Sequence, residues 1–178
     1  MTRWALEGAV NPTLLRVHVG VALTDETIVT CPPATAPPPV DRLLEIGAIR
    51  SLDVHRYRVR LNLFSWADRE ETARHASEIL EHAWGAATPL APDEGPRAFV
   101  AETGGLARRV AESPRMARGS RLLEAVFAVD GVSEAIAGDG LVLVRLGRVF
   151  VWDEAEAAVG RALAQSSVGM PGSTSEPR

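Results

Sequence analysis

Three arginines at alternating positions are the side chains in this sequence that are best suited to binding chemistry. Between His55 and Leu61, Arg56, Arg58 and Arg60 alternate with apolar residues, so that a strand would place all three guanidinium groups on one face. Guanidinium groups bind carboxylates, phosphates and other anions through paired hydrogen bonds. The simplest interpretation is a solvated strand whose charges discourage edge pairing. The alternative is a surface for an anion, an acidic partner or RNA, with RNA disfavoured because Tyr57 points to the other face.

The remaining reactive side chains do not form a catalytic or metal-binding pattern. Cys31 is the single cysteine, which excludes an internal disulfide and an all-cysteine metal site within one chain. His75 and His82 are seven residues apart, farther than the three or four residues that a chelating helical pair prefers, with Glu78 between them. We interpret these three residues as a solvated helix face. We therefore predict a non-enzymatic protein with no catalytic residues, no metal site and no cofactor.

Composition favours an ordinary globular protein. The chain has 178 residues, of which 46% are hydrophobic and 24% charged, and its formal net charge is -4. This balance supports a packed core, and the negative net charge argues against a dedicated nucleic-acid binder. We find no apolar run long enough to span a bilayer and no secretory leader pattern. The sequence therefore predicts a soluble, cytoplasmic protein without a membrane partner.

In the first half of the chain, hydrophobic periodicity and turn residues predict strands followed by a helix. Ser65 and Asp68 resemble a capping box, so Ser65 is the expected N-cap of that helix, and Trp66 is expected to pack in the core. In chain order, we expect a lead-in (1–11), a strand (13–20), a short strand that pairs with it (28–30), a Pro-rich connector (31–39), a short helix ending at Gly47, two strands (49–63) and a helix ending near Gly85.

The second half has similar signals. Ser113 and Pro114 mark a helix start, and Gly131 marks its end. Trp152 begins the last helix and is expected to anchor it in the core. In chain order, we expect a linker (86–96), a strand (97–101), a helical turn (106–111), a helix (113–130), a hairpin (132–144) and a helix (152–165), followed by a disordered tail (166–178).

The two halves follow one pattern of strand, connector, helix, turn, strand pair and Trp-initiated helix. This repetition predicts an internal duplication and an α+β fold of two similar small domains that pack as a pseudo-dimer. Each domain would be a mainly antiparallel sheet with two helices on one face. The domains would span residues 10–85 and 97–165, joined by the linker 86–96.

The alignment of the two halves places leucines where the first half has arginines. When Ile49 is matched with Val132, Leu141 and Leu143 take the positions of Arg58 and Arg60. The second sheet would then be apolar on both faces, and such a sheet must be covered on both. We therefore predict that Leu141 and Leu143 form an interface, either with the first half or in a homodimer.

Three segments resemble a known family. The segment 11–17 resembles the opening strand of the N-terminal domain of the Nfu/NifU scaffold proteins. Ser113-Pro114 and the segment 123–132 resemble that domain's helix and turn, and the two copies together cover about residues 10 to 165. In Nfu proteins a separate domain carries the iron–sulfur cluster through a Cys-x-x-Cys motif, which this chain lacks. The resemblance implies a duplicated scaffold or protein-interaction module, accessory to iron–sulfur cluster assembly, that does not carry the cluster.

Two other functions remain open at the level of sequence. One is a small-ligand-binding protein or enzyme with a pocket between the two halves, which would require clustered titratable groups in that pocket. The other is anion or RNA binding through Arg56, Arg58 and Arg60. Under the scaffold interpretation the partners are proteins, including iron–sulfur assembly proteins, and the chain is a monomeric pseudo-dimer or a homodimer.

Overall fold

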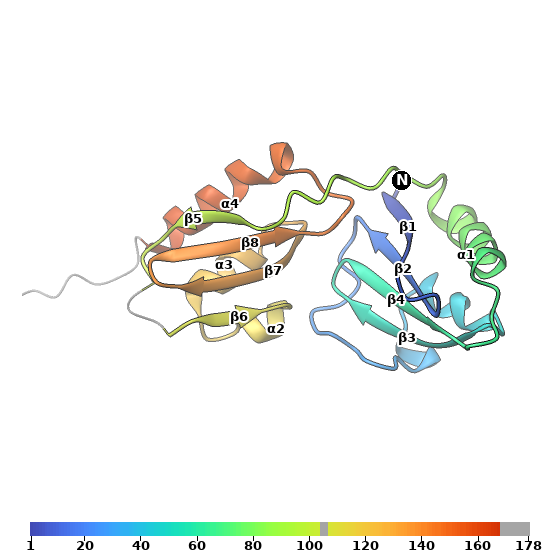
Figure 1. Cartoon of the computed structure of the whole chain (residues 1–178). Helices are drawn as coiled ribbons and strands as arrows, with labels where there is room; N and C mark the ends of the chain where they lie inside the picture. The colour runs from blue at the N-terminus through green and yellow to red at the C-terminus, as the bar shows by residue number, and fades with distance from the viewer. Residues whose placement is uncertain (104–106, 168–178) are drawn as a thin grey trace, which may run out of the picture.

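The chain forms an α+β fold with two four-stranded antiparallel sheets, one in each half (Figure 1). The computed structural model describes residues 1–103 and 107–167, with the side chain of Ser167 left out. The strands are β1 (Trp4–Gly8), β2 (Leu14–Val19), β3 (Ile49–His55) and β4 (Arg58–Leu63) in the first half, and β5 (Arg97–Val100), β6 (Arg109–Ala111), β7 (Val132–Gly138) and β8 (Leu141–Leu146) in the second.

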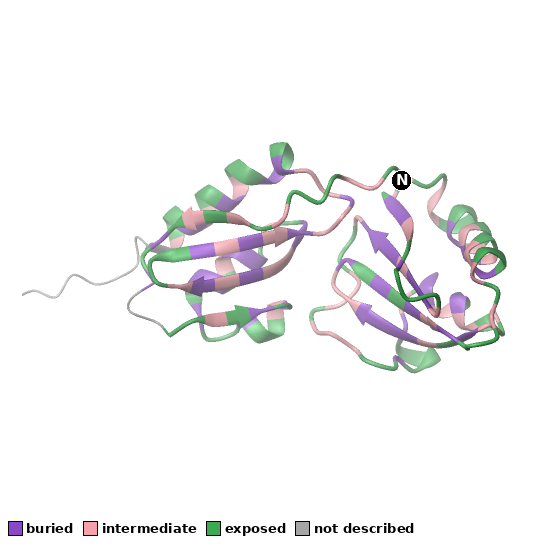
Figure 2. Cartoon of the chain, viewed as in Figure 1, coloured by how far each residue is buried: buried purple, intermediate pink, exposed green. Residues whose placement is uncertain are grey.

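The first sheet has the strand order β1-β2-β4-β3, and helices cover only one of its faces. Two 3-10 helices, η1 (Pro33–Thr35) and η2 (Val40–Glu45), and the helix α1 (Arg69–Trp84) accompany this sheet. Val59 and Leu61 of β4 are fully buried in a core shared with Leu80 of α1. The alternate residues Arg58 and Arg60 are exposed, so β4 has one apolar and one charged face (Figure 2).

The N-terminal segment is a strand and not the expected lead-in. Trp4 is fully buried, and its indole N–H donates a 2.7 Å hydrogen bond to the carbonyl of Gly85. β1 pairs with β2, and β4 occupies the other edge of β2. The predicted hairpin partner at 28–30 is therefore wrong: only Ile28 forms an isolated bridge, to Val54, and Thr30 has a φ of 50° that ends the extended conformation.

The start of α1 also differs from the prediction. Asp68, and not Ser65, is the N-cap, because its carboxylate accepts hydrogen bonds from the backbone N–H groups of Glu70 and Glu71 at 2.9 and 3.0 Å. This later start leaves Trp66 in the preceding loop, where it is 71% exposed and stacks on Phe64. The expected core position of Trp66 is therefore wrong. The predicted end of α1 at Gly85 is confirmed.

The second sheet has the strand order β5-β8-β7-β6 and is also covered on one face. Its helices are α2 (Pro114–Ala117), α3 (Arg121–Phe127) and α4 (Trp152–Ser167). In Figure 1, α3 and α4 lie on the same side of this sheet, and buried side chains of both helices join its core. Trp152 belongs to that core, as predicted, and is only 4% exposed.

Three predictions for the second half need correction. Residues 109–111 form strand β6 and not a helical turn, because they pair with β7; Leu106 lies outside the described residues. The helix predicted from Ser113 onward is two helices, because Gly119 adopts a φ of 80° and Ser120 caps a new start. α4 continues to Ser167, and the rest of the predicted tail lies outside the described residues.

The hairpins β3–β4 and β7–β8 correspond residue by residue. Each joins a seven-residue strand to a six-residue strand, and each has a register irregularity after the first residue of its first strand. Arg58 begins β4 opposite His55, and Leu141 begins β8 opposite Gly138. The structure therefore places Leu141 and Leu143 at the positions that correspond to Arg58 and Arg60.

Among the helices that the structure describes, none is both long and apolar enough to cross a membrane.

Candidate functional site

A cleft of about 380 Å³ lies between the two halves. Its first wall is the uncovered face of the first sheet, and its second wall combines strands β7 and β8 with the adjoining loops. The lining contains arginines, carboxylates and histidines, together with four other residues: Arg16, Arg56, Arg58, Arg145 and Arg148; Glu7, Asp93, Glu112 and Glu134; His18 and His55; Tyr57, Ser133, Leu146 and Gly147. Such a concentration of titratable groups is typical of binding and catalytic sites.

The β3–β4 turn holds the two halves together at the cleft. The ring of Tyr57 packs edge-on against Phe150 of the second half, with ring centroids 4.9 Å apart. Arg56 donates a 2.8 Å hydrogen bond to the carbonyl of Phe127. A Cβ atom at Gly147 would lie 3.0 Å from Cβ of Tyr57, so this close approach favours glycine. The turn is thus wedged against the second half and closes one end of the cleft.

Sheet register assembles the first wall. His18 on β2 and His55 on β3 both lie opposite Arg58 on β4, so the three side chains form one row on the uncovered face. Arg16 belongs to the next row on the same face. In the described part of the chain, Arg58 has no carboxylate within ion-pair distance, and its only hydrogen-bond contact, to Nε2 of His55, is 3.5 Å long.

The electrostatics of this wall are unbalanced toward positive charge. Burial by the walls of the cleft, together with the neighbouring Arg16, lowers the pKa of the Arg58 guanidinium, although part of the side chain remains open to solvent. Burial and the charge of Arg58 likewise lower the pKa of His55. Burial is the first cause of both shifts, and repulsion between the neighbouring cations of this wall adds to it. An anion placed there would relieve this repulsion.

At the other side of this wall, the Glu7 carboxylate is already paired with its neighbours. Its carboxylate contacts Nε2 of His18 at 2.9 Å, and it also pairs with Arg16 at 3.5 Å and Arg148 at 3.3 Å. Burial lowers the pKa of His18, only partly offset by Glu7. For Glu7, burial acts to raise the pKa, but the hydrogen bond with His18 and the nearby arginines lower it overall. Glu7 is therefore ionised at neutral pH and accepts a hydrogen bond from Nε2–H of a neutral His18.

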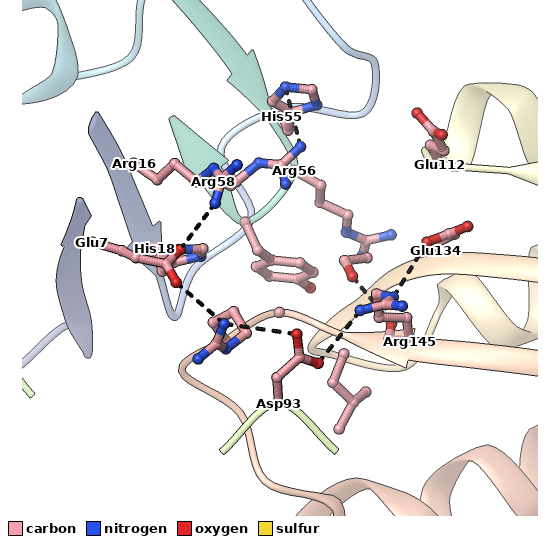
Figure 3. A pocket seen from close by; sticks show the side chains of 15 residues that line it. Glu7, Arg16, His18, His55, Arg56, Arg58, Asp93, Glu112, Glu134 and Arg145 are labelled. Atoms are coloured by element: carbon pink, nitrogen blue, oxygen red, sulfur yellow. Dashed lines mark hydrogen bonds and ion pairs between the residues drawn. The ribbon is translucent and has the colours of Figure 1, made fainter. Parts of the chain in front are cut away.

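The second wall is close to neutral. Arg145 pairs with Glu134 at 3.5 Å and with Asp93 at 3.4 Å, and Arg148 pairs with Asp93 at 3.8 Å as well as with Glu7. Figure 3 shows Arg16, Arg58 and His55 on one side of the cleft and Glu112, Glu134 and Arg145 on the other. The first wall thus carries one guanidinium, Arg58, that has no ion-pair partner among the described residues, whereas most charges of the second wall are paired. This arrangement suits a ligand carrying negative charge.

The three predicted arginines do not act as a single stripe. Arg56 and Arg58 both line the cleft, but Arg56 lies in the turn between β3 and β4 and reaches into the second half. The expectation that Arg56 continues the strand is wrong, because the hairpin reverses at residues 56 and 57. Arg60 stands opposite Arg16 on β4 but does not line the cleft, and it makes a long 3.9 Å contact with Asp53.

Leu141 and Leu143 lie outside the cleft, farther along β8 on the same uncovered face as Arg145. Leu141 is 41% exposed and Leu143 is partly exposed, so the first half leaves both open. Their role as an interface stays a prediction.

Several lining residues were absent from the sequence-based site. Arg16 and His18 alternate on β2, a signal that could have placed them on one face of a strand. Glu7 and Arg148 gave no such signal, because their partners are distant in sequence. Only the pairing of β2 with both β1 and β4 brings Glu7, His18 and Arg58 onto one wall.

Metal ligation has no support in the described regions. Residues 1–103 and 107–167 hold no group of three or more His, Cys, Asp or Glu side chains that could bind a metal ion. Cys31 is buried, and its Sγ lies 3.4 Å from Oγ1 of Thr35. On α1, Arg74 contacts both His75 and Glu78, at 2.8 and 2.6 Å.

Comparison of the chain with protein-family models, with curated proteins and with solved structures gave no match.

Proposed function

We propose that this protein binds a small anionic ligand in the cleft between its two halves. The observation that carries the proposal is the position of Arg58, which has no acidic ion-pair partner among the described residues and stands beside Arg16 and His55. A guanidinium in this setting is a donor of charge-assisted hydrogen bonds whose one side-chain contact, to Nε2 of His55, is long and uncharged. An oxyanion supplies that acceptor.

The chemistry of the walls defines the ligand class. Arg58, Arg16 and His55 together favour a compact group with several oxygen atoms, such as a phosphate, a sulfate or a pair of carboxylates. The cleft, at about 380 Å³, has room for a metabolite-sized molecule. We propose binding without a chemical step, because Glu7 holds His18 in place and the lining contains no nucleophile hydrogen-bonded to a base.

Isothermal titration calorimetry in a low-salt buffer tests this proposal, with sulfate, phosphate, pyrophosphate and citrate as separate probes. We expect at least one probe to bind the wild-type protein, and Arg58→Gln to weaken that binding about tenfold, the effect of losing a hydrogen bond to a charged group. Arg60→Gln is the matched control, because it removes the same charge from the next outward-facing position of β4, beyond the cleft lining.

Two results would contradict the proposal. One is the absence of heat with all four probes at millimolar concentration. The other is an equal loss of affinity in Arg58→Gln and Arg60→Gln, which would indicate attraction to the general charge of the sheet and not to the cleft.

We also infer that the two halves arose by duplication and pack as a pseudo-dimer around the cleft. The support for this inference is the equal strand lengths and the shared register irregularity of the hairpins β3–β4 and β7–β8. The resemblance to the Nfu/NifU N-terminal domain, and with it a scaffold role in iron–sulfur assembly through protein partners, stays a prediction from sequence. Recovery of cluster-assembly proteins in an affinity pull-down would support it.

A further inference from the structure

The uncovered face of the second sheet carries a continuous aliphatic surface that the cleft does not use. Directly opposed residues on neighbouring strands share a face, so the strand register identifies its members. One row crosses all four strands, and a second row lies beside it. We call this surface the aliphatic face; it consists of Ala98 and Val100 on β5, Leu141 and Leu143 on β8, Ile136 on β7 and Val110 on β6.

The aliphatic face is open to solvent in the monomer. Val100 is 89% exposed, Leu141 41% and Val110 40%, and the other three members are partly or fully exposed. The corresponding face of the first sheet is charged instead, with Arg58 and Arg60 at the positions of Leu141 and Leu143. One chain therefore contains one sheet suited to water on its free face and one that is not.

We propose that a second copy of this chain covers the aliphatic face, so that two second sheets pack face to face across a twofold axis. A flat sheet face is best covered by another sheet, which interdigitates its side chains at a spacing of about 10 Å. The free face of the first sheet cannot serve, because its arginines would lose their hydration. The second copy presents an apolar sheet face of the same size and shape.

Size and charge are compatible with this pairing. Four strands about 4.8 Å apart make a face roughly 19 Å wide, which can form the apolar centre of an interface of about 800 Å² per protomer. Homodimer interfaces are more apolar at their centre than transient ones. At the end nearest the cleft, Arg145 is neutralised by Glu134 and Asp93, so this border does not repel a second copy.

Sedimentation velocity over about 1 to 100 μM, a range that spans weak and moderate dimers, tests the proposal. We expect wild-type protein to shift from monomer toward dimer as concentration rises. Val100→Glu should raise the dimer dissociation constant at least about 100-fold, because dimerisation would bury an unpaired carboxylate. Val100 is so exposed that the monomer should fold normally, which circular dichroism verifies.

Val10→Glu is the matched control, because Val10 is a fully exposed valine outside the aliphatic face. It should dimerise like the wild type. Leu143→Glu, at the centre of the face, should reproduce the effect of Val100→Glu. A wild-type protein that stays monomeric throughout the range overturns the proposal, as does a dimer that withstands Val100→Glu. Ligand binding in the cleft is measured separately, so either proposal can fail alone.

Discussion

At the scale of single residues, Tyr57 is the most unusual side chain at the cleft. It is 2% exposed, yet its hydroxyl has no hydrogen-bond partner in the described part of the protein. Nε of the adjacent Arg56 is also buried and unpaired there. Buried polar groups without partners cost about 1–3 kcal/mol each. The contact between the halves is therefore stabilised by ring packing and by the Arg56–Phe127 hydrogen bond, and it is weakened by the two buried polar atoms that lack partners.

This cost leads to a prediction for Tyr57→Phe. The substitution removes the hydroxyl and keeps the ring against Phe150, so we expect the free energy of unfolding to stay the same or rise by about 1 kcal/mol. Urea unfolding measures it. Tyr57→Leu, which loses the edge-on ring contact, should instead lower stability by about 1–3 kcal/mol. A loss of more than about 1 kcal/mol in Tyr57→Phe would reveal an important partner for the hydroxyl.

At the scale of elements, the position of a helix start decides which aromatic residue enters the core. α1 begins after Asp68, so Trp66 stays in a loop and is exposed, whereas α4 begins at Trp152 itself and buries it. The two tryptophans therefore have different environments despite their similar places in the pattern. Moving the N-cap by about one turn, from Ser65 to Asp68, is enough to cause this difference.

The N-cap can be tested with two neighbouring substitutions. Asp68→Ala removes the acceptor for the backbone N–H groups of Glu70 and Glu71, and should lower the free energy of unfolding by about 1 kcal/mol. Ser65→Ala should change it by less than about 0.5 kcal/mol, because Ser65 is exposed and lies outside the helix start. Chemical unfolding midpoints compare the two. The reverse order of effects would restore the capping box inferred from sequence.

At the scale of the whole molecule, the cleft makes stability depend on pH. His18 and His55 both lie where the halves meet, and burial lowers the pKa of each below its ordinary value of 6.5. The unfolded chain therefore binds protons more readily at these sites than the folded chain does. Their contribution to stability is fully present above about pH 6.5 and is lost as the pH falls through the lowered pKa values of the folded protein.

We therefore expect the urea midpoint to fall between pH 7.5 and pH 5.5, a window in which the ordinary histidine pKa lies. His55→Gln should reduce the size of this fall. His82→Gln, on the exposed side of α1, is the control and should leave it unchanged. A midpoint that is constant or rises toward pH 5.5 would contradict the assignment of buried, neutral histidines at the cleft.

Local patterns were sufficient to predict much of the fold. Strict alternation identified β4, and glycines with left-handed φ marked the ends of elements at Gly85 and Gly131. The pairing of β3 with β4 and of β7 with β8 also followed from short-range signals, since neighbouring strands joined by a tight turn usually pair. These features depend on residues close together in the chain, so the sequence by itself determined them.

The cleft was decided only by tertiary structure. Glu7, His18 and Arg58 share a wall because β1 and β4 flank β2, a long-range choice that no local pattern encodes. The lining also needs Arg145 and Arg148 from the second half, which the wedged Tyr57 brings within reach. The sequence indicated that arginines and leucines exchange places between two similar hairpins. Tertiary structure decided that Arg58 has no carboxylate partner among the described residues and that Leu141 and Leu143 stay open, because both depend on what packs against each sheet face.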